Sequence, residues 1–151
     1  MDRVIASWFG TGLILGNLRG NDIGSGTVGA LFTFPIAYWV GQEFTWIGLA
    51  AVTVVVIGLS VWSTDRRAST DGDAGWIVVD EAAGTMLALI GLSLGPAFVA
   101  LVVFRLADIF KTRFPGVSRA ENIKGGWGIT ADDLVAGLYG LSAGHLVQAL
   151  L

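Results

Sequence analysis

The sequence predicts an all-α fold, a small polytopic bundle of membrane helices, some short or re-entrant, with a polar site on one face. Three observations support this prediction. Hydrophobic residues make up 54% of the 151 residues and charged residues only 14%, whereas soluble domains carry about 25% charged residues. The mean hydropathy is +0.71. The apolar residues also gather in four long segments, and the length of the chain predicts one membrane-embedded domain spanning 1–151.

The four apolar segments, each expected to be helical, are 28–41, 44–62, 82–107 and 134–151. The first two are separated only by the polar pair Gln42-Glu43, so we expect an antiparallel helical hairpin. The third is long enough to cross a bilayer once. However, Gly95-Pro96 interrupts it, and a proline inside a helix removes a hydrogen bond and kinks or ends the helix. The fourth segment closes the chain.

The positions of the charges distinguish one crossing over 82–107 from a hairpin at Gly95-Pro96. The hairpin brings every lysine and arginine to one face and leaves only Glu43 on the other, so we predict the hairpin. Its arms, 82–94 and 97–107, are shorter than the roughly 20 residues of a spanning helix, and we expect them to be buried steeply or re-entrant. Basic residues mark the cytoplasmic side, and here they are Arg3, Arg19, Arg66, Arg67, Arg105, Lys111, Arg113, Arg119 and Lys124.

The composition also excludes several classes of function. The chain has no cysteine, which excludes disulfides, thiolate metal sites and a cysteine nucleophile. Its net charge of -3 argues against nucleic acid as a partner, because nucleic acid requires a basic surface. Near the N-terminus, Arg3 precedes an apolar stretch that glycines interrupt, and no cleavage site follows. We therefore expect the chain to be mature protein.

Five carboxylates lie at the ends of the apolar segments. Asp80 and Glu81 begin the third segment, Asp108 follows it, and Asp132 and Asp133 precede the fourth. Simple alternatives exist, since acids stabilise helix N-termini, Thr130 and Asp133 fit a capping box, and Asp108 suits a local ion pair. Acids at the edge of a membrane are costly and tend to be functional. Together they would repel one another without a cation, and their oxygen ligands favour Mg²⁺.

Basic residues beside such a metal indicate a phosphate ligand. Arg105 and Lys111 recur with Asp108 at every third position, where helical residues are neighbours, and both side chains suit phosphate oxygens. The loop Gly24 to Thr27 precedes a helix, whose free N–H groups can hold an anion. A flexible turn with Thr27 as the N-cap is the alternative.

Four short motifs together resemble one family. SGTVGALFTFP, IVVDEAAG, FRLADIFK and GGWGITADDLVAG occur in this order, and they resemble the phosphatidylglycerophosphatase A family over roughly residues 10 to 140. The resemblance implies a Mg²⁺-dependent membrane phosphatase that converts phosphatidylglycerophosphate to phosphatidylglycerol in phospholipid biosynthesis. It also implies a multi-pass protein of the bacterial inner membrane whose active site faces the cytoplasm.

The same resemblance assigns the site residues by position. The implied catalytic residues are Asp80, Glu81, Asp108 and Asp133, the metal ligands are Asp80, Asp108, Asp132 and Asp133, and the phosphate-binding residues are Thr27, Arg105 and Lys111. Two departures from the family pattern, at Ser25 and within 112–121, leave the acids intact. We expect a difference in headgroup, if there is one, to come from 112–121.

The expected reaction is hydrolysis by metal-activated water, with Glu81 orienting or deprotonating the water. An aspartyl-phosphate intermediate is the alternative route. His145 is the single histidine, and we expect it to be structural. Two other functions remain as alternatives, a lipid-phosphate phosphatase with another headgroup and a non-catalytic membrane transport or lipid-binding protein.

Overall fold

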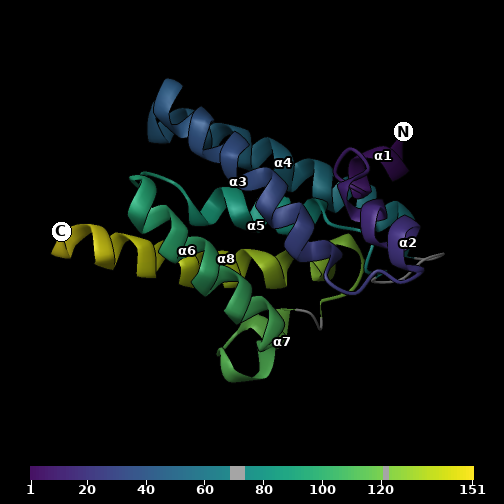
Figure 1. Cartoon of the computed structure of the whole chain (residues 1–151). Coiled ribbons are helices and arrows are strands. Elements are labelled where there is room, and N and C mark those ends of the chain that lie inside the picture. Colours follow the sequence, from purple (N-terminus) through teal and green to yellow (C-terminus); the bar gives the residue numbers. More distant parts are fainter. Residues whose placement is uncertain (69–73, 121–122) are drawn as a thin grey trace.

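The computed structural model describes residues 1–68, 74–120 and 123–151, and no strand occurs among them. The prediction of an all-α fold is therefore confirmed. Figure 1 shows the long helices running between the same two ends of the molecule. The elements in chain order are α1 (Asp2–Ala6), η1 (Thr11–Leu13), α2 (Ile14–Arg19), α3 (Ser25–Glu43), α4 (Thr45–Ala68), α5 (Val79–Ala88), α6 (Leu94–Ile109), η2 (Lys111–Arg113), α7 (Val117–Ala120) and α8 (Gly126–Leu150).

Helices α3 and α4 form the predicted hairpin, but with a tighter turn than expected. Gln42 and Glu43 lie in the last turn of α3, so the reversal falls at Phe44 and Thr45 instead. Thr45 has a φ of +63°, a backbone conformation that residues other than glycine seldom adopt. Helix α4 also continues to Ala68, six residues beyond the predicted end at Trp62, because its last turns pack against neighbouring helices.

The hairpin predicted within 82–107 is also present, with its turn a few residues earlier than expected. Helix α5 ends at Ala88 and α6 begins at Leu94, while Gly91 in the turn has a φ of +75°. Pro96 is thus in the first turn of α6, where its missing N–H removes no helical hydrogen bond. Both helices, of 10 and 16 residues, are shorter than a bilayer-spanning helix of about 20 residues.

The far end of α8 holds this turn in place. The Nε2 atom of His145 lies 3.0 Å from the carbonyl oxygen of Ile90. The side-chain amide of Gln148 donates to the Gly91 carbonyl at 2.9 Å and accepts from the Ser93 N–H at 2.7 Å. His145 therefore bonds to the backbone at the end of the bundle away from the carboxylates, as its expected structural role requires.

Helix α8 is the centre of the bundle, since α4, α5, α6 and α7 all pack against it. Glycines let these helices approach closely, as small residues do in membrane bundles. A Cβ atom on Gly137 would lie 2.8 Å from the carbonyl oxygen of Gly84 on α5, and one on Gly140 would lie 2.6 Å from that of Ala100 on α6. Close backbone contact thus fixes the position of α8 relative to both helices.

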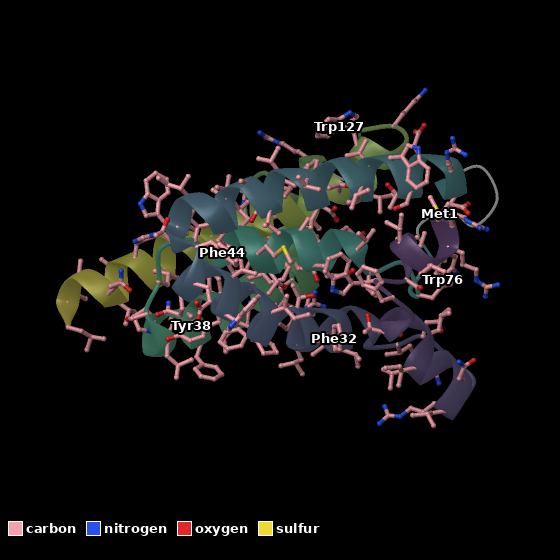
Figure 2. The ribbon with its side chains drawn as sticks, turned by 90° about the horizontal axis from the view of Figure 1, so that it is seen from above. Met1, Phe32, Tyr38, Phe44, Trp76 and Trp127 are labelled. Atoms are coloured by element: carbon pink, nitrogen blue, oxygen red, sulfur yellow. The ribbon has the colours of Figure 1, made fainter. Side chains whose placement is uncertain are left out.

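The two ends of the bundle differ in character. Helices α1 and α2 lie at one end in Figure 1, α7 lies below the bundle beside the end of α6, and the α3–α4 turn, the α5–α6 turn and the C-terminus lie toward the other end. Figure 2 shows Tyr38 and Phe44 toward the second end and Trp76 toward the first. Trp39, Trp46 and Trp127 are more than half exposed, as expected for interfacial residues, whereas Trp8 is only 6% exposed and is a packing residue.

Large apolar side chains are exposed on α3, α4, α6 and α8. Among the described residues one helix, Thr45–Arg67, has the length and composition of a membrane-crossing segment. Only 33% of its most apolar window is buried, which distinguishes it from the core helix of a soluble protein. Exposed apolar surface of this extent is unusual for a soluble monomer.

The close packing of α8 gives a first prediction. We expect Gly140→Ala to destabilise the protein by about 1–3 kcal/mol, because the added methyl meets the Ala100 carbonyl and overpacks the crossing. Gly58→Ala on α4 is the matched control, since no atom lies within 4 Å of its added Cβ and alanine favours a helix by about 0.5–1 kcal/mol. Thermal unfolding in detergent measures both. Equal effects of the two changes would contradict the close approach of α8 and α6.

Candidate active site

All five predicted carboxylates line one cavity of about 170 Å³ at the end of the bundle near α7. Lys111 lines it as well, so the cavity contains both signs of charge. The acids come from three helices, α5, α6 and α8, which are separate in the sequence. The full lining comprises Ala74, Gly75, Ile77, Asp80, Glu81, Asp108, Lys111, Ile129, Asp132 and Asp133.

Asp80 and Glu81 lie in the first turn of α5, where free N–H groups favour negative charge. The Oδ1 atom of Asp80 accepts a hydrogen bond from the Glu81 N–H at 3.1 Å. The N-cap residue of α5, Val78, is tied to α1 by a hydrogen bond from its N–H to the Ala6 carbonyl at 2.9 Å. The N-terminal segment thus anchors the start of α5 and the two acids on it.

Asp132 and Asp133 lie within α8 rather than at its start, which corrects the prediction that helix begins at Leu134. Helix α8 begins at Gly126, so Thr130 and Asp133 form no capping box. The Thr130 hydroxyl donates to the Gly126 carbonyl and pairs with Ser60 of α4 at 2.8 Å. Gly126 is needed for packing, since its Cβ would lie 2.3 Å from the Val61 carbonyl of α4.

Helix α6 supplies Asp108 and Arg105 as helical neighbours, as their spacing predicts. Their ion pair has an Nη1–Oδ2 distance of 3.0 Å, and the same Nη1 lies 4.0 Å from Oε1 of Glu81. Lys111 does not continue this row, because α6 ends at Ile109 and Lys111 begins η2. It turns to form an ion pair with Asp132 of α8. Arg105 therefore lies between carboxylates of α5 and α6, and Lys111 pairs with a carboxylate of α8.

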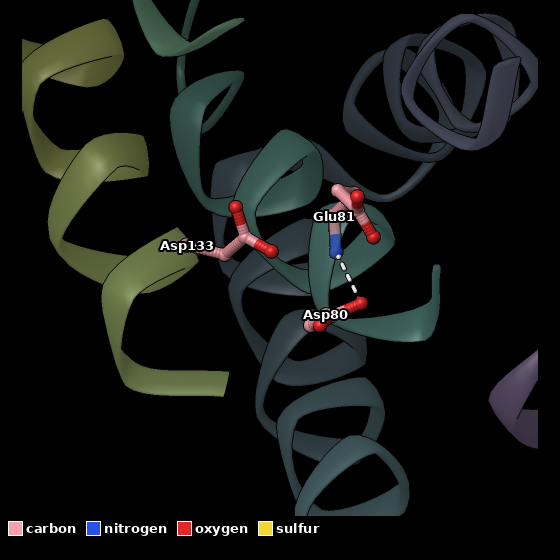
Figure 3. A group of neighbouring side chains, drawn as sticks. All are labelled: Asp80, Glu81 and Asp133. Carbon is pink, nitrogen blue, oxygen red and sulfur yellow. Dashed lines mark hydrogen bonds between the residues drawn. The ribbon is translucent and has the colours of Figure 1, made fainter. Parts of the chain in front are cut away.

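Three of the acids form a group that can hold a metal ion. One oxygen each from Asp80, Glu81 and Asp133 lies within 4.8 Å of the others (Figure 3). Oε2 of Glu81 and Oδ1 of Asp133 are buried and accept no hydrogen bond, an arrangement that is costly unless a cation is bound. Carboxylate oxygens are the ligands of hard cations such as Mg²⁺. The residues thus fit a divalent cation.

This group differs in composition from the predicted ligand set. It includes Glu81, which the sequence assigned to the water, whereas Asp108 and Asp132 lie beside it and form ion pairs with Arg105 and Lys111. Arg105 and Lys111, which the sequence assigned to a phosphate, pair with Asp108 and Asp132 in this structure.

Burial governs the electrostatics of the cavity. Loss of solvation raises the pKa of Asp133 well above its ordinary value, and the neighbouring carboxylates, Asp108 foremost, raise it further. Burial also raises the pKa of Glu81, although the hydrogen bond from Asp80 and the charge of Arg105 oppose the rise. Both groups therefore hold protons more strongly than free carboxyls and release them when a cation binds.

Thr27 lies outside the acid cavity but contacts Arg105. Its hydroxyl is 3.5 Å from Nη2 of Arg105, and it lies in the first turn of α3, so it is not the N-cap, which is Gly24. Gly26 is the closest part of α3 to the acids, since its Cβ would lie 1.9 Å from Oε1 of Glu81. Of the three predicted phosphate-binding residues, Thr27 and Arg105 are together and Lys111 lies within the acid cavity.

Sequence reasoning did not identify the residues that fix the start of α8. Oδ1 of Asp65 on α4 accepts a hydrogen bond from the Gly126 N–H at 3.1 Å, beside the Ser60–Thr130 pair. These contacts join positions more than 60 residues apart, and no local spacing signals them. Of the segment 112–121, the structure describes only 112–120.

Comparisons with known proteins give matches over most of the chain. A family model described as Phosphatidylglycerophosphatase A matches residues 4–148. A relative in Escherichia coli K12 named phosphatidylglycerophosphatase A is 32% identical over 95% of this chain and 80% of its own length. A Bacteroides thetaiotaomicron protein, provisionally named phosphatidylinositol-3-phosphatase, is 30% identical over 90% of this chain and 86% of its own. No solved structure gives a significant match.

The raised pKa values predict how stability depends on pH without metal. Between about pH 4 and 7 the unfolded chain releases protons from Asp133 and Glu81 before the folded chain does, so the free energy of unfolding should fall as pH rises. Thermal unfolding with a chelator should show this loss of stability as a lower unfolding temperature at higher pH. Added Mg²⁺ should raise the unfolding temperature, most strongly at pH 7. In chelator at pH 7, Asp133→Asn should unfold at a higher temperature than the wild type.

Glu43→Gln is the matched control for that measurement, because Glu43 is exposed at the opposite end of the bundle. It should leave the pH dependence unchanged. A metal-free protein whose stability rises between pH 4 and 7 would contradict the burial of these protonatable groups.

Proposed function

Because this chain belongs to the phosphatidylglycerophosphatase A family, we propose that it hydrolyses the terminal phosphomonoester of phosphatidylglycerophosphate to give phosphatidylglycerol, in phospholipid biosynthesis. The chain is a lipid phosphatase by that membership. The observation that carries the proposal is the buried group of oxygens from Asp80, Glu81 and Asp133, with two cations beside it. This arrangement suits a divalent metal and a phosphate ester together.

The proposed metal site consists of Asp80, Glu81 and Asp133, with Asp108 and Asp132 adjacent to it. Mg²⁺ bound there would supply Lewis-acid charge that stabilises the phosphoryl group in the transition state and acidifies a water molecule. Asp108 and Asp132 then keep Arg105 and Lys111 positioned at the cavity through their ion pairs. The two basic side chains would thus be positioned before the lipid binds.

Arg105 and Lys111 are the proposed phosphate-binding residues, with Thr27 in support. The Nε atom of Arg105 is buried and makes no hydrogen bond, so a donor remains for a phosphate oxygen. Lys111 lines the cavity itself and would add a point charge. Thr27 holds the Nη2 side of the guanidinium, which leaves the Nε side for the substrate.

Glu81 is the proposed proton acceptor for the attacking water. One of its oxygens belongs to the metal-binding group, and a carboxylate has a second oxygen for the water. The alternative, in which an aspartate attacks phosphorus directly, would leave a phosphoryl group on the protein.

We also propose that the protein is embedded in the cytoplasmic membrane, with the acid cavity on the cytoplasmic side. The exposed apolar side chains of α3, α4, α6 and α8 support embedding, and the gathering of basic residues at the end with the cavity supports the orientation. The cavity would then face the soluble side, where water and Mg²⁺ are available.

Phosphate release by the purified protein in detergent tests the function. We expect Mg²⁺-dependent release from phosphatidylglycerophosphate that a chelator abolishes. Asp80→Asn exchanges a charged ligand for a neutral amide oxygen and should raise the Mg²⁺ concentration for half-maximal rate by about 10-fold or more, while Glu43→Gln should not. The same assay with phosphatidylinositol 3-phosphate tests the headgroup in the other relative's name. If phosphate were released faster from this lipid, it would be the better candidate for the substrate. Phosphate release that a chelator does not reduce would contradict the metal site.

Glu81→Gln tests the proposed base. The amide keeps an oxygen ligand but accepts no proton, so kcat should fall by about 10²–10⁴-fold, and the acidic limb of the pH–rate profile should disappear. Steady-state rates between pH 5 and 9 at saturating Mg²⁺ measure this. If additional Mg²⁺ restored the rate, Glu81 would be a metal ligand only.

A further inference from the structure

A second cavity lies beside the acid cavity, between α3 and α6. Its volume is about 250 Å³, and apart from Thr27 and Arg105 its lining is apolar. Ala30 and Leu101 are buried and form its floor, whereas Leu31 and Val102 are more than half exposed at its edge. We call this cavity the α3–α6 groove.

Contacts between the two helices bound the groove at both ends. At one end the rings of Phe34 and Phe98 stack with their centroids 4.7 Å apart. At the other end Arg105 donates to the Thr27 hydroxyl. These contacts are seven residues apart on each helix, a distance of roughly 10 Å at 1.5 Å per residue. The groove is therefore a short apolar channel that ends at a cation.

Arg105 connects the groove to the acids, because it lines the groove and pairs with a carboxylate of the acid cavity. Its Nη1 atom forms the ion pair with Asp108, a residue of the acid cavity. A molecule with a phosphate beside Arg105 and a hydrocarbon chain along α3 and α6 would satisfy both environments. This is the chemistry of a lipid phosphate.

We propose that the α3–α6 groove binds one acyl chain of the lipid phosphate substrate, which enters sideways from the bilayer past Leu31 and Val102. This inference rests on the proposed function of the acid cavity. The groove has a volume of about 250 Å³ and an apolar lining that ends at Thr27 and Arg105, so it suits the apolar chain and the phosphate of one lipid.

Narrowing the groove at its edge tests the proposal. Val102→Trp places a large side chain at the edge without adding volume to the buried floor, and Val54→Trp on α4 is the matched control, because Val54 is 68% exposed and is not part of the groove. The assay compares kcat/KM for phosphatidylglycerophosphate with long acyl chains and with hexanoyl chains. We expect Val102→Trp to lower the ratio of long-chain to short-chain kcat/KM about tenfold or more, and Val54→Trp to leave it unchanged.

An unchanged ratio in Val102→Trp would overturn the proposal, and a changed oligomeric state with an unchanged ratio would assign the groove to contact between copies. If the wild type hydrolyses neither lipid, the proposed function fails instead. The short-chain rate shows whether the variant is folded, because it depends on the acid cavity.

Photolabelling tests the groove without relying on catalysis. The probe is phosphatidic acid with a diazirine midway along one acyl chain, irradiated with the wild-type protein in detergent with Mg²⁺. We expect labelled peptides from 30–34 and 98–106, and we expect excess unlabelled phosphatidic acid, but not phosphatidylcholine, to compete. Labelling spread over the exposed apolar faces of α4 and α8 would overturn the proposal.

Discussion

Burial of several carboxylates within one cavity is the constraint on which the rest of this structure depends. Asp80, Asp132 and Asp133 are each less than 5% exposed, and charges held this close repel strongly where water is excluded. Arg105 and Lys111 each neutralise one neighbour, and the remaining group of oxygens fits a divalent cation. The folded chain thus carries an electrostatic cost that ligand binding removes.

The position of α8 makes this cavity possible. Glycines at its contacts with α4, α5 and α6 allow backbones to meet, and these contacts place Asp132 and Asp133 opposite the start of α5. The Ser60–Thr130 and Asp65–Gly126 contacts fix its rotation and its first turn. The five carboxylates of the cavity therefore all lie on helices.

The clustered carboxylates lie at one end of the bundle, and side chains of α8 hold a turn at the opposite end. There His145 and Gln148 bond to the α5–α6 turn, which fixes where α6 begins. Since α6 supplies Arg105 and Asp108 and one wall of the apolar groove, this turn influences both cavities from a distance. One arginine between the cavities would let a lipid keep its chain in an apolar environment while its phosphate meets the metal.

The sequence by itself determined the all-α class, the two hairpins and the identity of the clustered residues, because apolar segments, the breaks between them and the positions of charged residues can be read along the chain. The tertiary structure decided where helices begin and end. Helix α8 starts eight residues before the predicted Leu134, since Asp65 and Ser60 of α4 stabilise its first turns. It also decided which carboxylates meet, because the oxygens of Asp80, Glu81 and Asp133 come within 4.8 Å of one another, and Asp108 pairs with Arg105, only after α5, α6 and α8 have packed.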